Sequence, residues 1–375
     1  AFERFMAVAD ERRRLEVWAN ADTEDQSSNA RARGAQGIGL CRTEHMFLGD
    51  ERVAAVRKMI FAENEEEEQE AYAALEPLQK DDFKVILKAM DGLPVTIRLL
   101  DPPLHEFLPN HVDLAVEVAT ERAHDRDTGK DRKLKGKELE ERKRLLQKVS
   151  ELEEANPMLG LRGVRLGIVK PGLYAMQVRA IVEAAAELKK KGGDPRPEIM
   201  IPLVATAEEL SRMRDELEPV VADVLKSEGV ELEVPFGTMI ELPRAALRAG
   251  EIAEGADFFS FGTNDLTQTT YGFSRDDIGK FLSMYEERKL LPANPFVTID
   301  RPGVGRLMQI AVEEGRASND SLHLGICGEH GGDPDSVLFC DEIGLDYVSC
   351  SPFRVPVARL AAAQAVLGAA ETSSK

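Results

Sequence analysis

The strongest constraint on the fold is the regular alternation of short β-type runs with long helical patterns along almost the whole chain. Such alternation is typical of a parallel sheet whose strands are joined by helices. Eight runs have the composition of strands, at residues 15–20, 37–40, 95–100, 199–203, 236–241, 258–262, 322–327 and 346–351. Helical patterns separate them, for example at residues 173–191, 207–226, 243–254 and 302–316. Eight such units predict an α/β fold, a single (β/α)8 TIM barrel with extra helices.

Two charged stretches do not fit a minimal barrel. Residues 62–75 form an acidic helical run, which we interpret as a solvated helix face. Residues 121–152 form a charged insertion, with a flexible Gly/Lys part and then an exposed amphipathic helix at residues 137–152. Its basic residues could form an anion-binding face, but the acids between them favour a solvated helix. We therefore expect an N-terminal linker or helix at residues 1–14 and one barrel domain at residues 15–375.

The charge balance narrows the classes of partner. The 375 residues include 48 Lys and Arg against 67 Asp and Glu, a formal net charge of -19. A field of this sign repels nucleic acid and anionic membranes, so both are excluded as partners. An anionic substrate would have to be held by arginines placed locally against the overall charge.

The cysteines indicate a reducing compartment. Cys41, Cys327, Cys340 and Cys350 form no CxxC pair and no zinc-ligand spacing, which is typical of reduced thiols in the cytoplasm or a similar compartment. No apolar run reaches the roughly 18 residues of a membrane helix, and the N-terminus has no signal-peptide apolar region. The chain begins without Met, which is consistent with a fragment of a longer protein.

Reactive side chains cluster where the predicted strands end. In a β/α barrel the C-terminal strand ends converge on one mouth, where the active site is built. Seven residues lie at or just beyond such an end: Asn20, Arg42, Arg98, Glu241, Asn264, Asp265 and Cys327. Their number and matching chemistry predict one site.

Two of these residues form a candidate metal site. Glu241 and Asp265 each follow an apolar strand, and two neighbouring carboxylates repel unless a cation or proton lies between them. Mg²⁺ suits such a pair, because it takes one or two carboxylates and completes its shell with water and substrate oxygens. The alternative is that Asp265 only caps the following helix. The tetrad GTND, residues 262–265, also offers backbone N–H groups, and Asn264 an amide, to a phosphate or carboxylate.

Arginines are the candidate grip for an anion, since the guanidinium matches carboxylate and phosphate geometry. Arg98 lies within a predicted strand, where a guanidinium needs an anionic partner or a polar cavity. The alternative for Arg98 is a structural ion pair, for instance with Asp101. Arg42 follows another strand, while Arg162 and Arg275 lie in predicted loops and are weaker candidates.

The stretch GICGEHGGDP, residues 325–334, presents Cys327 between glycines at a strand end. A lone cysteine beside an apolar run is most often a buried hydrophobe. At a mouth with a metal and arginines, however, the thiol could move a proton at a carbon made acidic by a neighbouring carbonyl. Glu329 and His330 could tune the thiol, or could equally serve as loop residues that bond the glycine turn.

Six motifs carry a family resemblance over about residues 15–370. They are GIGLCRTEHMF, TIRLLDPPLHEFLP, NPMLGLRGVRLGI, GTMIELPRAAL, FFSFGTNDLTQ and GICGEHGGDP. Together they resemble the C-terminal phosphoenolpyruvate/pyruvate-binding domain of the pyruvate, phosphate dikinase family. The sister families, phosphoenolpyruvate synthase and enzyme I of the sugar phosphotransferase system, share the TND and GxCG patterns, but the forms CRTEHMF, DPPLHEFLP and CGEHGG resemble the dikinase family more closely.

The resemblance implies a barrel that binds phosphoenolpyruvate or pyruvate with Mg²⁺. A phosphoryl group would pass between the substrate and a phosphohistidine on a separate domain. By motif, Arg42, Arg98 and Arg275 would hold phosphate and carboxylate, and Cys327 would donate or accept a proton at the pyruvate methyl carbon. Glu241 and Asp265 would bind Mg²⁺. Gly262, Thr263 and Asn264 would line the substrate, with Glu241 and Asp265 also at the substrate.

The resemblance also sets expectations about the whole protein. The family's phosphohistidine motif and nucleotide domain do not occur in this sequence, so the chain by itself would carry only the pyruvate half of the reaction. The alternatives are a binding and dimerisation module without turnover, or the equivalent domain of one of the sister families. A homodimer is implied, in the cytoplasm or, in a plant or alga, in a plastid. The charged insertion is longer than the family leads us to expect.

Overall fold

The structure is a computed structural model that describes residues 2–47, 50–127 and 136–373. Within these residues, eight parallel strands pair in chain order and close into a barrel through β1 and β8. The strands are β1 (Glu16–Asn20), β2 (Ile38–Arg42), β3 (Pro94–Arg98), β4 (Arg196–Ile201), β5 (Phe236–Ile240), β6 (Phe258–Phe261), β7 (His323–Ile326) and β8 (Tyr347–Cys350). Each strand overlaps one predicted run, so the predicted (β/α)8 barrel is confirmed.

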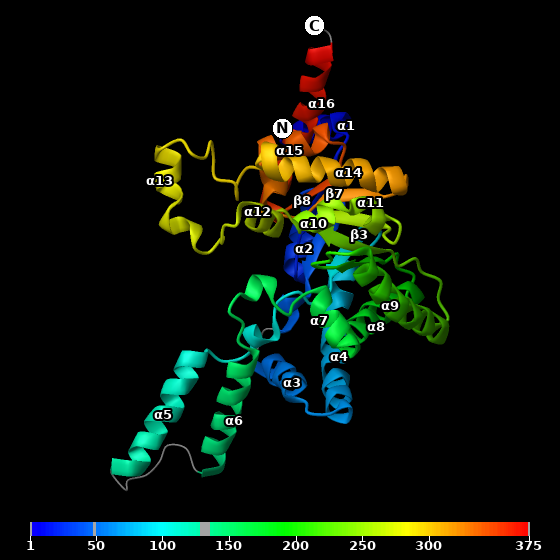
Figure 1. Ribbon diagram of the computed structural model, residues 1–375. Coiled ribbons are helices and arrows are strands. Elements are labelled where there is room, and N and C mark those ends of the chain that lie inside the picture. Colours follow the sequence, from blue (N-terminus) through cyan, green and yellow to red (C-terminus); the bar gives the residue numbers. More distant parts are fainter. Residues whose placement is uncertain (1, 48–49, 128–135, 374–375) are drawn as a thin grey trace. The chain divides into compact units, whose positions relative to one another are not determined.

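The chain divides into two compact units. Residues 1–46, 76–101 and 163–375 form the barrel unit, and residues 47–75 and 102–162 form the second unit. The helices of the barrel unit are α1 (Phe2–Arg12), α2 (Glu24–Ala32), α7 (Val164–Val169), α8 (Pro171–Lys190), α9 (Ala207–Glu228), α10 (Pro243–Leu247), α11 (Ala249–Ala253), α12 (Thr263–Tyr271), α13 (Leu282–Glu287), α14 (Arg306–Ser318), α15 (Pro334–Glu342) and α16 (Val355–Ser373) (Figure 1). The second unit contains α3 (Asp50–Phe61), α5 (His111–Asp127) and α6 (Gly136–Leu152). Helix α4 (Glu65–Ala89) begins in the second unit and ends in the barrel unit.

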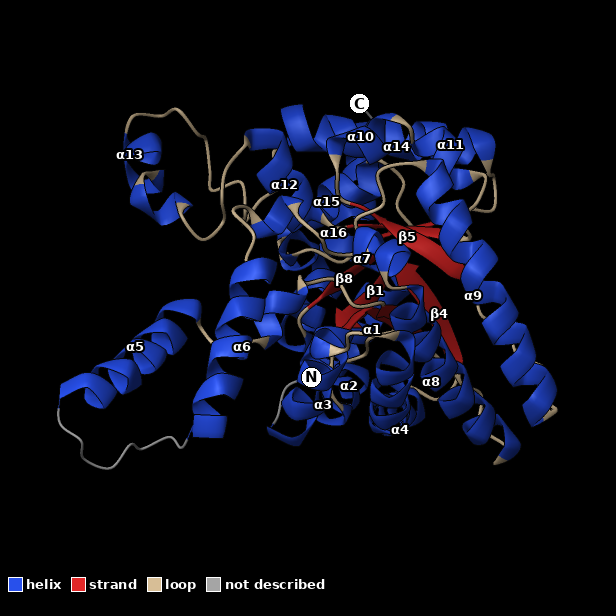
Figure 2. Ribbon diagram, turned by 60° about the horizontal axis from the view of Figure 1, so that its bottom comes forward, coloured by secondary structure: helices blue, strands red, loops and turns tan. Residues whose placement is uncertain are grey.

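The barrel strands are short and apolar because helices cover their outer faces. Every residue of β5 and β6 is buried. Figure 2 shows α8 and α9 beside the red strands β4 and β5, and α8 contacts both β4 and α9. Helix α9 begins at a capping box, in which Thr206 and Glu209 each satisfy a backbone N–H of the other, and it ends at Gly229 with φ 65°.

An aromatic stack fills part of the barrel interior. The Trp18 and Tyr347 rings stack with their centroids 4.0 Å apart. A Cβ atom at Gly325 would lie 2.0 Å from the Tyr347 ring, so only glycine lets β7 pass this stack. Strand β7 ends at Ile326, and Cys327 is therefore the first residue after the strand.

The second unit is helical. Buried Leu114 and Val118 of α5 and Leu139 and Val149 of α6 form its apolar contacts. The predicted amphipathic helix at residues 137–152 corresponds to α6. The Gly/Lys part of the predicted insertion falls largely on residues 128–135, which lie outside the described residues.

The acidic run predicted at residues 62–75 belongs to the beginning of α4, which is longer than predicted. Glu65, Glu66 and Glu67 are exposed, whereas Tyr72 and Leu75 are buried. The charges therefore lie on a solvated face of a helix whose other face packs. Across the described residues, no helix combines the length and apolar character needed to cross a membrane.

Candidate active site at the C-terminal strand ends

The predicted site residues lie at one rim of the barrel. Asn20, Arg42 and Arg98 are the last residues of β1, β2 and β3, while Glu241 and Cys327 directly follow β5 and β7. Because parallel strands of a closed barrel end at the same rim, these side chains share one opening, which we call the mouth.

Arg98 lies in the most strongly charged part of the mouth. Its side chain is 10% exposed and its Nη1 atom lies 3.0 Å from Asp101 Oδ2, while Nη2 pairs with Glu44. The ion pair with Asp101 is the structural alternative considered from the sequence, and it is present. Burial alone would lower the pKa of the guanidinium, but the carboxylates of Glu44, Asp101 and Glu241 raise it, so Arg98 stays charged. Its buried Nε atom has no hydrogen-bond partner within the structure described.

Arg42 belongs to a second charged group. Its Nη2 atom lies 3.1 Å from Asp22 Oδ2, and its backbone N–H donates to Asp22 Oδ1 at 2.8 Å. His45 Nδ1 lies 2.8 Å from the same carboxylate. The Arg42 side chain remains 35% exposed, whereas that of Asp22 is 3% exposed. The carboxylate therefore orients Arg42 while leaving it accessible to a ligand.

Glu241 is held by an unusual backbone conformation. The side chain is buried, and its Oε1 atom accepts the Leu203 N–H at 2.6 Å. Leu203 has φ 63°, a left-handed conformation that non-glycine residues rarely adopt. Backbone strain of this kind persists where surrounding structure enforces it and clusters at functional sites. A Cβ atom at Gly262 would lie 2.6 Å from Glu241 Oε2, so glycine is needed for this carboxylate to fit.

The GTND tetrad forms the start of α12. Gly262 is the N-cap, so Asp265 lies in the third helical position and does not cap the helix, contrary to the alternative considered from the sequence. Asp265 Oδ1 accepts a hydrogen bond from Gln268 Nε2 at 3.0 Å. Asn264 Oδ1 accepts from the backbone N–H of Glu329 at 3.4 Å. The tetrad and the glycine loop around Cys327 are thus neighbours.

The donor chemistry of the mouth fits Mg²⁺. Glu241 and Asp265 provide hard carboxylate oxygens from the ends of the adjacent strands β5 and β6. In the described part of the chain, no three His, Cys, Asp or Glu side chains gather as a metal cluster. Two carboxylates are nevertheless sufficient for Mg²⁺, because it keeps several waters and substrate oxygens in its shell.

Cys327 has apolar neighbours, although its thiol also feels the charges of Glu241, Arg98 and Arg42. It forms a buried cluster with Leu40, Met200, Met239 and Phe258. Its Sγ atom lies 3.8 Å from the Phe261 carbonyl oxygen, to which the thiol can donate. Burial raises the pKa of the thiol to about 11, the charge of Glu241 adds to the rise, and the Ser260 hydroxyl, Arg98 and Arg42 oppose it. The Cys327 thiol is therefore protonated at neutral pH.

Asn20 fixes the backbone of the cysteine. Its Nδ2 atom donates to the Cys327 carbonyl oxygen at 2.9 Å, and its Oδ1 atom accepts from Ser349 Oγ at 2.6 Å. The first and last strands of the barrel thereby position the loop that follows β7.

The remaining predicted arginines differ in their placement. Arg275 lies beyond α12, is 44% exposed at its side chain, and has its Nη2 atom 3.9 Å from Glu329 Oε1. Arg162 belongs to the second unit. Of the predicted charged and reactive residues, Arg42, Arg98, Glu241 and Cys327 lie at strand ends, and Asp265 lies in the first turn of α12.

Sequence reasoning named Asp101 but missed two other acidic partners of the arginines. Asp22 lies two residues beyond Asn20, and Glu44 lies two residues beyond Arg42. Both could have been found by treating a carboxylate just past a strand end as the partner of a predicted arginine. Nothing in the pattern indicated the left-handed Leu203.

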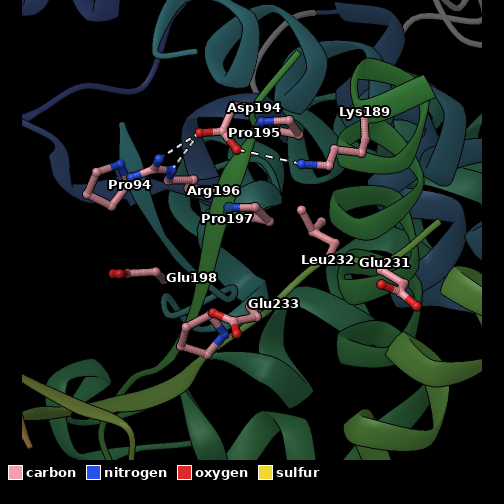
Figure 3. A pocket seen from close by; sticks show the side chains of 11 residues that line it. Pro94, Lys189, Asp194, Pro195, Arg196, Pro197, Glu198, Glu231, Leu232 and Glu233 are labelled. Carbon is pink, nitrogen blue, oxygen red and sulfur yellow. Dashed lines mark hydrogen bonds and ion pairs between the residues drawn. The ribbon is translucent and has the colours of Figure 1, made fainter. Parts of the chain in front are cut away.

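A hollow lies at the opposite rim of the barrel. Its volume is about 710 Å³, and it is lined by the first residues of β3 and β4 and by the segment before β5 (Figure 3). Asp194 pairs there with Arg196 at 2.7 Å and lies 3.7 Å from Lys189. This hollow, which we call the floor cavity, contains none of the predicted site residues.

Comparisons with known proteins agree with the motifs. A family model described as "PEP-utilising enzyme, PEP-binding domain" matches residues 1–367. The chloroplastic pyruvate, phosphate dikinase of Flaveria trinervia is 56% identical over 97% of this chain and 37% of that protein. The corresponding chloroplastic protein of Arabidopsis thaliana is 55% identical over 97% of this chain and 36% of that protein.

A bacterial relative is similar over the same extent. The pyruvate, phosphate dikinase of Clostridium symbiosum is 52% identical over 98% of this chain and 40% of that protein. The chain thus spans less than half the length of these curated relatives.

Proposed function

The chain belongs to the family of PEP-utilising enzymes, whose PEP-binding domain it matches, and on this premise we propose that its mouth binds phosphoenolpyruvate and pyruvate. We propose further that it carries the pyruvate half of a phosphotransferase reaction of the pyruvate, phosphate dikinase type. The observation that supports this most directly is the common setting of Cys327, Arg98 and Glu241, whose charges act on one another at the mouth.

The anion is held by two kinds of donor. Arg42 is oriented by Asp22 yet remains accessible, and Arg98 keeps one buried donor, Nε, without a partner in the described structure. The start of α12 adds backbone N–H groups, where a helix favours negative charge. These groups oppose the overall negative charge of the protein locally, and Arg275 joins them from the segment beyond α12.

Glu241 and Asp265 would hold Mg²⁺ together with oxygens of the substrate. When bound, the ion would supply charge stabilisation to an enolate oxygen and to the phosphoryl group. Arg98 and Arg42 contribute positive charge to the same region without moving protons, because guanidinium groups remain charged. Such preorganised charge is usually the main source of rate in phosphoryl transfer.

The Cys327 thiol moves the proton. When the phosphoryl group leaves phosphoenolpyruvate for a histidine nitrogen on a separate domain, which becomes phosphohistidine, an enolate remains. The S–H proton then passes to the methylene carbon, which gives pyruvate and leaves a thiolate that Arg98 and Arg42 stabilise. In the reverse direction the thiolate takes a methyl proton from pyruvate, and the enolate oxygen accepts the phosphoryl group. The raised pKa of the free thiol suits the donor role in the first direction.

The wider setting of the protein follows from the same premise. All four cysteines are free and buried, which suits a reducing compartment, the cytoplasm or, as the names of the plant relatives suggest, a plastid. We propose a homodimer and a phosphohistidine carrier and nucleotide-binding domain outside residues 1–375. The chain spans 37–40% of the compared relatives from Flaveria and Clostridium, which is in keeping with such further domains.

Solvent-deuterium exchange tests this proposal. Pyruvate is incubated with the protein and Mg²⁺ in deuterium oxide, and methyl deuteration is followed by NMR. We expect Cys327→Ala to lower the exchange rate by about 10²- to 10⁴-fold, the usual loss for a general acid or base. Phosphoenolpyruvate binding, measured by calorimetry, should be retained because the arginines are unchanged.

Cys340→Ala is the matched control, because Cys340 is equally buried but lies in α15. It should exchange like the wild type. Equal exchange rates for wild type and Cys327→Ala would remove Cys327 from the reaction, and failure of the wild type to bind phosphoenolpyruvate would overturn the proposed function.

A further inference from the structure

We infer that His330 is a positioning residue, which takes up the Thr263 hydroxyl hydrogen so that Thr263 meets an anionic ligand through its backbone N–H alone. The inference deepens the proposed function, on which it rests for the identity of the ligand. Thr263 has two groups that could meet a ligand, its hydroxyl and its backbone N–H, and the inference assigns a different role to each.

The imidazole lies between two segments that are far apart in the sequence. His330 belongs to a short 3₁₀ helix, η6 (Glu329–Gly332), and is fully buried. Its Nδ1 atom lies 2.7 Å from Thr263 Oγ1, and its Nε2 atom lies 2.9 Å from the Pro295 carbonyl oxygen. Both ring nitrogens are therefore engaged within the protein.

The partners fix the tautomer. A carbonyl oxygen can only accept, so Nε2 must carry a hydrogen. In a neutral imidazole Nδ1 is then the acceptor, and the Thr263 hydroxyl must donate to it. Burial lowers the pKa of His330, which keeps the ring neutral, although the hydrogen bond to the Pro295 carbonyl and the charges of Asp333 and Glu329 oppose this effect. Arg275 acts in the same direction as burial.

The hydroxyl of Thr263 is thereby taken out of ligand binding as a donor. A threonine hydroxyl has one hydrogen, and that hydrogen points to Nδ1. The oxygen also lies against the cysteine loop, since a Cβ atom at Gly328 would be 2.0 Å from it. What Thr263 can still offer an anion is its N–H in the first turn of α12.

The same imidazole ties a third segment to the mouth. Pro295 lies in the long connection between α12 and α14, which also carries Arg275. Phe296 is buried and the Ile299 N–H donates to Ser336 Oγ at 3.0 Å, so the Pro295 end of this connection is anchored. Loss of the Nε2 hydrogen bond should therefore loosen this anchor while leaving the Thr263 contact intact.

Two conservative variants separate the two hydrogen bonds. In His330→Asn, Oδ1 can replace Nδ1 as the acceptor for Thr263, while the bond to Pro295 is lost. In His330→Gln, Nε2 can still donate to Pro295, but the acceptor for Thr263 is lost. We expect His330→Asn to raise the Kd for phosphoenolpyruvate by less than about 3-fold and His330→Gln by about 10-fold, in keeping with one hydrogen bond of 1.4 kcal/mol.

Thr263→Val supplies the decisive comparison. If the hydroxyl serves only the imidazole, Thr263→Val and His330→Gln act on one bond, and the double variant should bind no more weakly than the weaker single variant. Additive losses in this double-mutant cycle would show that the hydroxyl contacts the ligand itself, which would overturn the inference. Equal affinity of His330→Gln and the wild type would also overturn it.

Tautomer measurement keeps the test independent of ligand binding. In the wild-type protein labelled with ¹⁵N-histidine, long-range ¹H–¹⁵N NMR should show His330 as the neutral Nε2–H form. The signal is assigned by its absence in His330→Asn. A neutral Nδ1–H form or a charged ring at pH 7 would contradict the inference. Absence of phosphoenolpyruvate binding beside the expected tautomer would instead count against the proposed function.

Discussion

At the C-terminal rim of the barrel, Arg98 lies between Asp101 and Glu44 in a network with little exposure. At the opposite rim, Arg196 and Lys189 share Asp194, and their side chains are 58% and 39% exposed. Both rims thus carry cations paired with carboxylates. At the floor cavity, water screens the ion pairs. At the mouth little water reaches the ion pairs, so the paired side chains solvate each other.

The buried carboxylates of the two rims differ in their hydrogen-bond partners. Glu241 at the mouth accepts a backbone N–H from the strained Leu203. Glu198 at the floor cavity accepts a hydrogen bond from the Thr96 hydroxyl at 2.7 Å, and burial raises its pKa to about 7. The floor cavity and the mouth thus differ in the arrangement of their charged and hydrogen-bonding groups.

Among the variants of the two rims, we expect Arg98→Met to lower stability and ligand binding the most. Removing the guanidinium takes the Arg98 partner away from Glu44 and Asp101, two carboxylates with little exposure, and breaking a buried pair in this way typically costs about 3–5 kcal/mol. We expect the free energy of unfolding in urea to fall by this amount and phosphoenolpyruvate binding to be lost.

A second change tests the cause of that loss. Glu44→Gln in the Arg98→Met background removes one of the stranded charges, so it should restore part of the stability but none of the ligand binding. A loss of less than about 1 kcal/mol for Arg98→Met would mean that the mouth pairs are as weak as exposed ones.

The fold could be predicted because its signal is local and repeated. Each barrel strand is an apolar run, and the repeated alternation with helices gives the closed barrel its order without knowledge of any contact. The same reasoning predicts the positions of the residues at the strand ends, because all C-terminal strand ends of such a barrel lie at one rim. These residues are Asn20, Arg42, Arg98, Glu241 and Cys327.

The sequence suggested Asp101 as a partner of Arg98, but it did not single out the other acidic partners, whose contacts depend on three-dimensional packing. Asp22 and Glu44 were ordinary acids in a chain rich in them, and only the folded strands bring them to Arg42 and Arg98. The protonated state of Cys327 was equally hidden, because it arises from Leu40, Met200 and other side chains on distant strands. The division into two units also depends on contacts that no local pattern records.

An intermediate effect is expected for Glu198→Gln, and it depends on pH. A carboxylate with a raised folded pKa holds a proton that the unfolded chain has lost between about pH 4.5 and 7, so wild-type stability falls across that window as pH rises. Glutamine carries no charge at any pH. The difference in free energy of unfolding between the variant and the wild type should therefore be about 1–3 kcal/mol more favourable to the variant at pH 8 than at pH 5.

Urea unfolding at the two pH values measures this difference. Glu233→Gln is the control, because Glu233 lines the same cavity but is exposed. If Glu198→Gln shifts stability equally at pH 5 and pH 8, Glu198 is ionised like an ordinary surface carboxylate and the contrast with Glu241 loses its basis.

The smallest effect is expected for Arg196→Gln at the floor cavity. Arg196 contacts Asp194 through Nε at 2.9 Å and Nη2 at 2.7 Å, a geometry as good as that of Arg98 with Asp101. Exposed pairs nevertheless contribute only about 0–1 kcal/mol, because water competes for both partners. We expect unfolding in urea to change by no more than this, and the difference from the wild type to shrink further in 1 M salt. A loss approaching that of Arg98→Met would show that geometry outweighs burial at both rims, and the distinction drawn between mouth and floor would then fail.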